Sequence, residues 1–291
     1  MRVIVLGAGG MLGHKLVQRL RRSHDVAGTI RAACPDTALE KAVCGTKIYT
    51  NVDALQLQSV IAAIEDWRPS VVINCIGIIK QIEAANDPVE SIAINALFPN
   101  QLARLTSVRD AKLIHFSTDC VFSGRRGNYA EEDHPDPTDL YGRTKLLGEV
   151  SAPDSLTLRT SIIGQELRGH HGLIDWFLAQ RGRQAKGFAN ARFSGLTTLD
   201  FAELVRYIIG AQPDLHGLWH VSSDPISKFD LLGIVNRIYG LEIGLARDET
   251  FVCDRSLNSA RFRKRTGWQA PSWEDMITGM HAEAGSYGYT S

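Results

Sequence analysis

The sequence has no excess of charge of either sign. Its 32 Lys and Arg residues balance its 32 Asp and Glu residues, so the formal net charge at pH 7 is zero. Nucleic-acid-binding domains usually carry a basic excess, and this balance argues against a nucleic-acid partner. Two short basic runs, 19–22 and 261–265, are typical of solvated helix faces.

Long apolar runs are also missing. No stretch approaches the ~18–20 apolar residues that a membrane-spanning helix needs. The first residues do not resemble a signal peptide, because only four apolar residues separate Met1-Arg2 from the first glycine. We therefore expect no membrane partner and a cytoplasmic location.

The five cysteines are scattered, and no two of them form a Cys-x-x-Cys pair. Such a set predicts neither a disulfide framework nor a zinc site, and reduced thiols fit a cytoplasmic protein. The adjacent His170 and His171 lack carboxylates at ligand spacing. We therefore predict no metal site.

The sequence does have an ordinary apolar content, 44% of 291 residues, and a regular alternation of short and long apolar patterns. Short buried runs separated by longer helical patterns predict βαβ units and a doubly wound parallel sheet of the Rossmann type. The predicted strands are 3–6, 25–30, 47–50, 70–75, 112–117, 155–159 and 217–221, and the predicted helices are 11–22, 54–67, 88–106, 140–150, 173–180, 199–210, 228–239 and 272–284.

The last third of the chain is less regular and predicts a smaller C-terminal substrate lobe. We expect a dinucleotide-binding domain over 1–165 and the lobe over 166–291, with segments near 190–221 returning to the first domain. Doubly wound sheets bind ligands beyond the carboxyl ends of their strands. Functional residues are therefore expected on the loops that follow those ends.

A glycine-rich turn follows the first predicted strand. Its Gly-x-x-Gly-x-x-Gly spacing differs from Gly-x-Gly-x-x-Gly, since Leu12 occupies the last glycine position of that pattern. A turn of this kind lets the backbone approach a pyrophosphate and begins a helix whose free N–H groups attract phosphates. A plain tight turn is the alternative. The predicted cofactor contacts are Gly7, Gly10, Met11, Leu12 and Gly13.

The end of the second predicted strand indicates which dinucleotide is bound. NAD enzymes usually place Asp or Glu there, whereas this chain has no carboxylate at that point and continues with Arg31. A guanidinium suits a 2′-phosphate, so Arg31, helped by Thr29, predicts NADP(H). An ordinary exposed loop arginine is the alternative. Asp53 could accept a bond from the adenine amino group or cap a helix beginning at Ala54.

Tyr141 and Lys145 form the candidate catalytic pair. Their spacing of four places both on one face of the predicted helix. A tyrosine with a pKa of about 10 is a poor acid–base group at neutral pH unless its anion is stabilised, and a nearby ammonium does this. Thr118 ends a strand 23 residues earlier and can hold a substrate carbonyl. The three residues predict an oxidoreductase.

These motifs together resemble the extended short-chain dehydrogenases/reductases, and within them the dTDP-4-dehydrorhamnose reductase family. The matching segments follow the family's order over most of the chain, and the sequence is identified as a member. They are 7–13, 52–53, 74–77, 93–96, 117–124, 141–145, 148–149 and 158–161.

The resemblance implies a role for each matching residue. Tyr141 would protonate the keto oxygen, Lys145 would bind the nicotinamide ribose, and Thr118 would polarise the carbonyl with Asp119 beside it. Asn95 would hold backbone and water geometry near the lysine. A plain buried amide is the alternative for Asn95, and a turn or cap residue is the alternative for Asp119. Further residues that would line the cofactor are Val52, Cys75, Ile76 and Gly77.

The resemblance also implies sugar contacts. Ser161 and Ile162 would lie near the nicotinamide and the sugar. Arg192 and Arg255 would bind a diphosphate, with surface salt bridges as the alternative. Ile162 stands where the rhamnose-forming enzymes carry tryptophan, and the loop at 78–81 also departs from the family. These departures leave the particular sugar open.

The implied function is reduction of a keto group, at C4, on a nucleotide-linked deoxysugar by NADPH, in surface polysaccharide or glycoside assembly, by a possible homodimer. An epimerase or dehydratase of the same superfamily is one alternative. Asp119-Cys120 disfavours the dehydratase, which usually has Asp-Glu there. A non-catalytic NADP-binding regulatory subunit is the other alternative, and retention of Thr118, Tyr141 and Lys145 argues against it.

Overall fold

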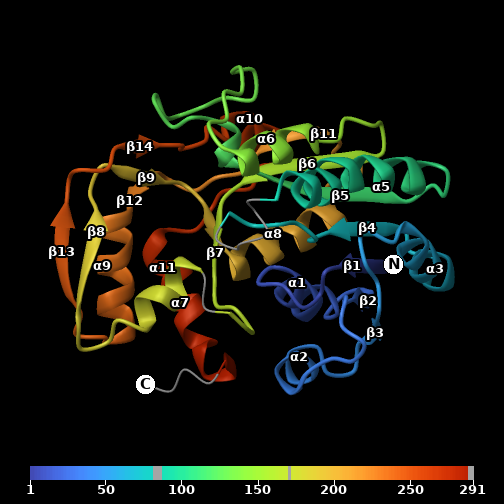
Figure 1. The fold of residues 1–291 in the computed structure, drawn as a ribbon, viewed down its shortest axis with the longest axis horizontal. Coiled ribbons are helices and arrows are strands. Elements are labelled where there is room, and N and C mark those ends of the chain that lie inside the picture. Colours follow the sequence, from blue (N-terminus) through green and yellow to red (C-terminus); the bar gives the residue numbers. More distant parts are fainter. Residues whose placement is uncertain (81–86, 170–171, 288–291) are drawn as a thin grey trace. The chain divides into compact units, whose positions relative to one another are not determined.

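The computed structural model describes residues 1–80, 87–169 and 172–287, so His170 and His171 lie outside the described residues. The chain forms two compact units, each assembled from three segments (Figure 1). The first unit comprises Met1–Thr118, Thr138–Arg159 and Ala202–Trp219, and the second comprises Asp119–Pro137, Thr160–Phe201 and His220–Ser291.

A seven-stranded sheet forms the core of the first unit, in the order β11-β6-β5-β4-β1-β2-β3. The central strands pair in parallel, which confirms the predicted Rossmann-type sheet. Strand order reverses between β1 and β4, and this switch point is where doubly wound sheets bind ligands. The strands are β1 (Arg2–Leu6), β2 (Asp25–Thr29), β3 (Lys47–Tyr49), β4 (Val71–Asn74), β5 (Lys112–Thr118), β6 (Ser155–Thr160) and β11 (Gly217–His220).

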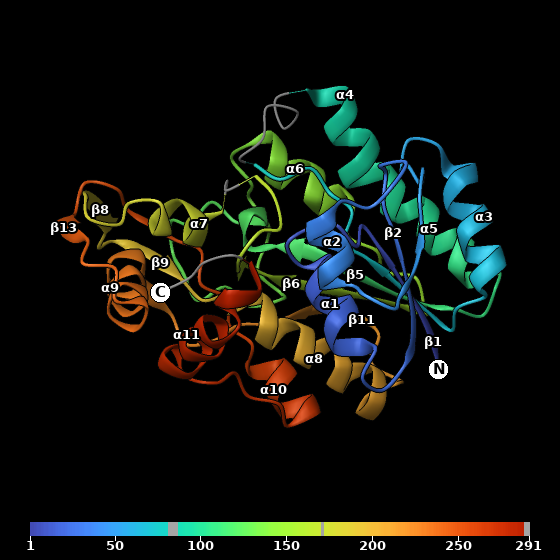
Figure 2. The same cartoon turned by 90° about the horizontal axis from the view of Figure 1, so that it is seen from below.

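Helices cover the sheet of the first unit because its central strands are apolar on both faces. Residues 3–6 of β1 are all fully buried. One apolar cluster joins Ile4 and Leu6 to α3 (Leu57–Trp67) and α5 (Phe98–Ser107). The helices α1 (Gly13–Leu20) and α2 (Thr37–Ala42), and α8 (Thr198–Ala211) from Ala202 onward, also belong to this unit and are seen from below in Figure 2.

The predicted helix over 88–106 is not uniform. It consists of α4 (Pro88–Ser91), a π-helical segment η2 (Ile92–Leu97) and α5. Pro99 has no N–H, so it cannot donate the α-helical bond to the carbonyl of Asn95. Such wide turns are often found at functional sites.

The helix predicted to begin at Ala54 begins at Leu57 instead. The Asp53 carboxylate accepts a hydrogen bond from Leu55 N at 2.9 Å, so it forms a turn ahead of the helix and is not its N-cap. Of the two roles weighed for Asp53, the capping of a helix at Ala54 was therefore wrong.

The second unit contains short strands that the periodicity did not predict. Runs of two to five residues are too short for an alternating pattern to be read reliably. By contrast, α9 (Lys228–Tyr239) has the predicted limits, because Ser227 caps its start and Gly240 ends it with φ of 58°. The other elements are β7 (Ile162–Ile163), β8 (Gln184–Phe188), β9 (Ala191–Phe193), β10 (Leu196–Thr197), β12 (Ile226–Ser227), β13 (Gly244–Asp248), β14 (Cys253–Asp254), α7 (Leu173–Leu178), α10 (Ala260–Thr266) and α11 (Trp273–Ala282).

Within the described part of the chain, no helix combines the length and apolar character needed to cross a membrane.

Candidate active site

The turn between β1 and α1 lies at the switch point of the sheet. Gly7 has φ of 83°, a conformation that side-chain-bearing residues rarely adopt. A Cβ at Gly13 would lie 2.1 Å from Gly7 O, so only glycine allows α1 to begin this close to the turn. Gly10 of this turn is exposed, and a dinucleotide pyrophosphate requires close approach to such a backbone.

Thr29, at the end of β2, holds this turn through two hydrogen bonds. It is fully buried, its hydroxyl accepts from Gly7 N at 3.2 Å, and its carbonyl accepts from Ala8 N at 2.8 Å. Arg31, two residues further on, is exposed beyond the carboxyl end of β2. Thr29 therefore shapes the turn, whereas Arg31 is available to a ligand.

The segment after β4 borders the same turn. Ile76 packs against Gly7, because a Cβ on Gly7 would lie 3.1 Å from Ile76 Cγ1. Cys75 N donates to Leu6 O at 3.0 Å, and Ile76 N donates to the Asn74 side chain at 3.0 Å. These bonds hold the 75–77 segment against the end of β1. Two other predicted cofactor residues follow β3, the buried Val52 and the partly exposed Asp53.

Asn95 ties three segments together from the π-helical turn. Its Oδ1 accepts from Ile78 N at 2.9 Å, and its Nδ2 donates to Ile78 O at 3.0 Å and Thr144 Oγ1 at 3.4 Å. The side chain is fully buried. Asn95 thus joins the segment after β4 to the helix that carries Tyr141 and Lys145.

That helix, α6 (Leu140–Leu147), is fixed at both ends. At its start the Asp139 carboxylate accepts from Gly142 N at 2.8 Å, which satisfies a free helical donor. At its end a Cβ on Gly148 would lie 1.9 Å from Asn95 O, so glycine permits the close approach to η2. Asn100 of α5 adds a bond from Nδ2 to Leu147 O at 3.2 Å.

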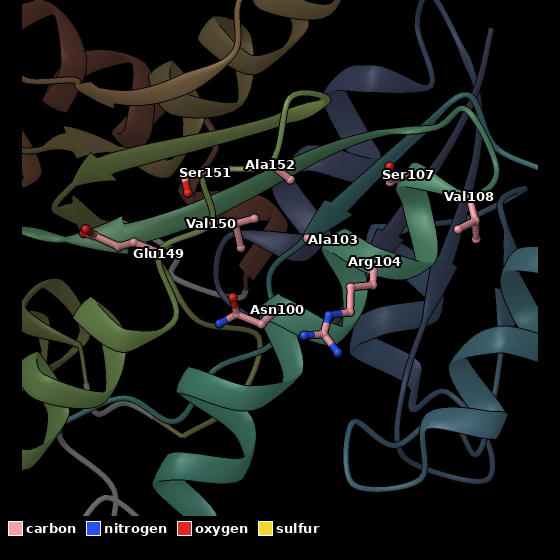
Figure 3. A pocket seen from close by; sticks show the side chains of 9 residues that line it. All are labelled: Asn100, Ala103, Arg104, Ser107, Val108, Glu149, Val150, Ser151 and Ala152. Carbon is pink, nitrogen blue, oxygen red and sulfur yellow. The ribbon is translucent and has the colours of Figure 1, made fainter.

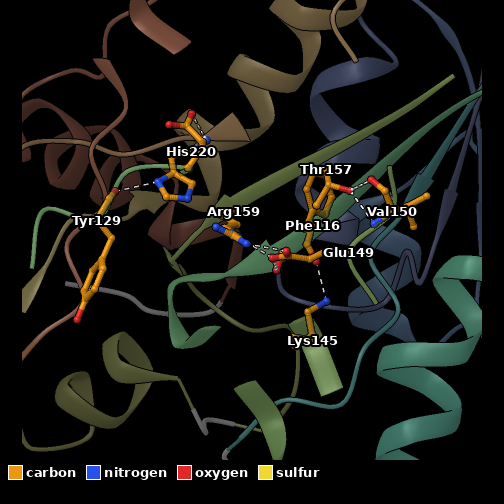
Figure 4. A network of polar contacts seen from close by, with 10 residues as sticks. Phe116, Tyr129, Lys145, Glu149, Val150, Thr157, Arg159 and His220 are labelled. Atoms are coloured by element: carbon orange, nitrogen blue, oxygen red, sulfur yellow. Dashed lines mark hydrogen bonds and ion pairs between the residues drawn. The ribbon is translucent and has the colours of Figure 1, made fainter. Parts of the chain in front are cut away.

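The catalytic candidates meet where α6 lies beside the end of β5. Lys145 is buried, and its ammonium donates to Phe116 O at 2.6 Å (Figure 4). Phe116 precedes Thr118, the last residue of β5, by two positions. Tyr141 lies one helical turn before Lys145 and is partly buried. The first unit therefore holds all three side chains near one strand end.

Burial lowers the pKa of Lys145 to about 8, and the negative charge of Glu149 opposes that shift. Burial raises the pKa of the Cys75 thiol, so Cys75 is neutral near pH 7. Burial and the charge of Lys145 lower the pKa of His115 well below its usual value, so its imidazole is neutral too. The site therefore combines a lysine cation with neutral neighbours on β5 and after β4.

A surface hollow of the first unit lies elsewhere, beside α5 and the residues that follow α6 (Figure 3). Asn100, Arg104 and Ser151 contribute to its lining. None of the predicted catalytic or cofactor residues lines it. The candidate active site is therefore placed at the glycine turn and at the carboxyl ends of the strands, and not at this hollow.

In the second unit the two predicted diphosphate residues come from neighbouring strands. β9 and β14 pair with Arg192 opposite Asp254, the residue before Arg255. Arg192 is exposed. Arg255 is partly buried and donates from Nε to Phe122 O at 2.8 Å and from Nη1 to Cys120 Sγ at 3.7 Å. Arg255 therefore braces the segment after the predicted Asp119.

The other predicted sugar contacts also belong to the second unit. Asp119 is buried in a single 3-10 turn, Asp119–Val121. Ser161 and Ile162 are partly buried at the start of β7, where Leu196 N donates to Ser161 O at 2.9 Å. Backbone pairing with β10 thus fixes this pair of residues.

The sequence-based prediction missed three polar residues of the first unit, two of them buried and one, Glu149, partly buried. Ser117, Glu149 and Arg159 form a hydrogen-bonded group beside Lys145. Glu149 follows Lys145 by four positions, the spacing that links Lys145 to Tyr141, and this was the available signal. Its partners could not be read from local spacing.

Among residues 1–80, 87–169 and 172–287, no group of three or more His, Cys, Asp and Glu side chains is arranged to hold a metal ion.

Several known proteins are similar to this chain. The family described as RmlD substrate binding domain matches residues 1–237. A probable dTDP-4,6-dihydroxy-2-methyloxan-3-one 4-ketoreductase of Streptomyces antibioticus is 30% identical over 270 residues, 86% of this chain and 81% of that protein. The dTDP-4-dehydrorhamnose reductase of Mycolicibacterium smegmatis is 34% identical over 193 residues, 64% of this chain and 51% of that protein. Mouse (Mus musculus) methionine adenosyltransferase 2 subunit beta is 31% identical over 150 residues, 51% of this chain and 41% of that protein.

Solved structures resemble the fold over nearly the whole chain. A hypothetical dTDP-4-dehydrorhamnose reductase from Sulfolobus tokodaii has a TM-score of 0.78 at 26% identity, covering 94% of this chain and 98% of that one. The dTDP-4-dehydrorhamnose reductase of Bacillus anthracis, solved in complex with NADP, has a TM-score of 0.79 at 22% identity, covering 97% and 99%. The second likeness supports the fold alone.

Proposed function

This chain belongs to the RmlD substrate-binding domain family, and we propose that it is an NADPH-dependent reductase of a keto group, at C4, on a nucleotide-linked deoxysugar. One observation carries the proposal. Lys145 is a buried cation that binds the Phe116 carbonyl near the end of β5. Tyr141 lies one helical turn before Lys145, and Thr118 lies two residues after Phe116. This combination suits proton donation to a carbonyl oxygen.

The glycine turn fits the proposed cofactor, since the absence of a side chain at Gly13 lets α1 begin against Gly7, and the free N–H groups at a helix start attract phosphates. The pyrophosphate would lie on this turn, with Arg31 on the 2′-phosphate and Lys145 on the nicotinamide ribose. When bound, the cofactor supplies the hydride. The predicted cofactor contacts belong to the first unit, whereas the predicted sugar contacts, including Asp119, Ser161 and Ile162 from before residue 166, belong to the second.

The protein's own groups then manage the proton. Tyr141 donates its phenolic proton to the keto oxygen, and the Lys145 ammonium stabilises the phenolate that remains. The Thr118 hydroxyl donates a hydrogen bond to the same oxygen and so holds the carbonyl in place. Asn95 keeps α6 and the 75–78 segment in register while this occurs.

The substrate class follows from the relatives and from the second unit. The relatives from Streptomyces antibioticus, Mycolicibacterium smegmatis and Streptomyces niveus are all named as reductases of dTDP-linked keto compounds. Arg192 and Arg255 would bind the diphosphate, and Asp119, Ser161 and Ile162 would contact the sugar. Because Ile162 stands where the rhamnose-forming enzymes carry an aromatic residue, the proposed substrate is a 4-keto nucleotide sugar and no particular sugar is named.

A binding subunit is the second candidate, favoured by the similarity to methionine adenosyltransferase 2 subunit beta. A reductase and a binding subunit both bind NADPH, but only the reductase turns it over.

The decisive assay follows NADPH oxidation at 340 nm with a panel of 4-keto nucleotide sugars that vary in base and in sugar stereochemistry. We expect at least one compound to be reduced with kcat of about 1–1,000 per second. Micromolar NADPH binding without turnover of any compound would instead support the binding subunit. Conversion of a sugar without net NADPH consumption would point to an epimerase or dehydratase.

The cofactor assignment predicts a selective effect of Arg31→Ala. Loss of the guanidinium removes charge-assisted bonds to the 2′-phosphate, worth about 1.5–3 kcal/mol for a charged partner, so the KM for NADPH should rise by about 10–100-fold. The KM for NADH should stay within twofold, because NADH has no such phosphate. Arg21→Ala, at the end of α1, is the matched control. Equal changes for both cofactors would refute a 2′-phosphate contact.

The same proposal extends to a homodimer in the cytoplasm, where NADPH and activated sugars are available to a protein with free thiols. Neighbouring helices of the first unit expose four large apolar side chains, namely Val89, Ile92, Leu97 and Leu147. A second copy would cover them. Sedimentation of the 32.0 kDa chain as a dimer, and of Leu147→Glu as a monomer, tests this.

A further inference from the structure

The Glu149 carboxylate accepts three hydrogen bonds inside the first unit, and Figure 4 shows it beside Arg159. Its Oε1 accepts from Ser117 Oγ at 2.6 Å and from Arg159 Nε at 2.7 Å, and its Oε2 accepts from Arg159 Nη2 at 2.8 Å. The side chains of Arg159 and Glu149 are 3% and 12% exposed. This is a two-pronged buried ion pair with a hydroxyl added to it.

Glu149 extends the row of residues on α6 that face β5. Gly148 N and Glu149 N donate to Lys145 O and Leu146 O at 3.2 Å each, so the chain keeps winding past the end of the helix. Lys145 binds the carbonyl of Phe116, and Glu149 binds the hydroxyl of the next residue, Ser117. Lys145 of α6 and Glu149 just after it therefore bind Phe116 and Ser117, the two residues of β5 immediately before Thr118.

A buried ion pair is a weak way to stabilise a fold. Removing two charges from water is costly, and well-packed apolar residues in their place are often equally stable. The arrangement at Glu149 is better explained by what its charge does to its neighbours. Arg159, at the end of β6, holds that charge in one orientation.

The groups facing Lys145 leave Glu149 as the anion that supports it. Cys75 approaches from the segment after β4, and its thiol is neutral because burial raises its pKa. His115 on β5 is neutral because burial lowers its pKa. Tyr141, on α6 itself, is neutral before it donates its proton. Of these groups, only Glu149 is charged at neutral pH, and it counteracts the loss of Lys145 hydration.

We propose that Glu149 is a positioning residue for the reduction, which keeps Lys145 charged and holds the strand end at Thr118 against the catalytic helix. It acts through Ser117, Arg159 and Lys145 and touches no reactant. The inference rests on the proposed function of Tyr141 and Lys145.

The test variant is Glu149→Gln, which keeps the shape and one carbonyl acceptor but removes the charge. Lys145 must be protonated to serve, so kcat/KM in the parent should fall above about pH 8. Without the anion the lysine loses its proton at lower pH, and this alkaline limb should move down by about one pH unit. NADPH affinity at pH 6, where Lys145 is charged in both proteins, should stay within twofold.

Two further variants separate charge from stability. Glu149→Gln combined with Arg159→Met also removes the arginine whose carboxylate partner the single variant takes away, and it should restore the melting temperature while keeping the shifted limb. Ser117→Ala keeps the Glu149 charge, and it should lower kcat several-fold with the limb unmoved. If both Glu149 variants keep the parent's limb and lose only melting temperature, the proposal is overturned.

A spectroscopic readout distinguishes this inference from the proposed function. Isotope-labelled lysine side chains, with Lys145→Met to assign the signal, report the Lys145 titration by NMR without any substrate. A downward shift in Glu149→Gln supports the charge role even if the parent reduces no sugar in the panel. An active parent with an unshifted Lys145 titration rejects the charge role and leaves the reductase intact.

Discussion

Replacing Tyr141 with phenylalanine should lower kcat for keto reduction by about 1,000-fold, within the range that a lost general acid produces. Phenylalanine keeps the ring in the first turn of α6 and removes only the hydroxyl, so α6 and its contacts should be unchanged. The Kd for NADPH should stay within about twofold, because Lys145 and the glycine turn are intact. Stopped-flow NADPH oxidation with the best compound of the panel measures the first value, and fluorescence titration measures the second.

The same substitution at another tyrosine of the first unit is the matched control. Tyr207→Phe removes a hydroxyl of α8 that accepts a hydrogen bond at 3.2 Å from Nε2 of Gln212, the residue after that helix. It should leave kcat within twofold of the parent. A Tyr141→Phe protein that keeps more than a tenth of the parent's kcat would show that another group donates the proton, and the proposed role of Tyr141 would have to be abandoned.

The sequence predicted the features that depend on neighbouring residues. A strand, a turn and a helix were predicted from the run Val3–Leu6, the glycines after it and the apolar pattern that follows. The sheet to which this strand belongs is confirmed. The limits of α9 were predictable for the same reason, since Ser227 and Gly240 are local signals. The family named from these motifs is also confirmed.

Features that depend on distant contacts were not predictable. The π-helical turn at Ile92–Leu97 allows Asn95 to reach Ile78 and Thr144, which come from two other segments. The β7–β10 and β9–β14 pairs are too short to show a period. The role inferred for Glu149 needs Arg159 and Ser117, which only the folded chain brings to it. The motifs located the ends of the sheet strands to within one residue but did not predict which side chains support the residues there.

Gly13→Ala should strongly disturb the backbone of the cofactor turn. The new Cβ would lie 2.1 Å from Gly7 O and 2.9 Å from Gly7 C, and backbone atoms cannot rotate away as a side chain can. The turn must therefore open or the start of α1 must move. Overpacking of this kind costs about 1–3 kcal/mol of unfolding free energy. Chemical denaturation followed by far-UV circular dichroism measures that loss.

The same displacement should weaken NADPH binding beyond the loss of stability, by at least about 10-fold, because the pyrophosphate depends on the N–H groups at the start of α1. Gly210→Ala is the control: Gly210 is an exposed helical residue of α8 with no atom within 4 Å of an added Cβ. There alanine should stabilise the protein by about 0.5–1 kcal/mol and leave NADPH affinity unchanged. If Gly13→Ala bound NADPH as tightly as Gly210→Ala does, the close contact between Gly13 and Gly7 would not be needed for the cofactor, and the proposed pyrophosphate position would be wrong.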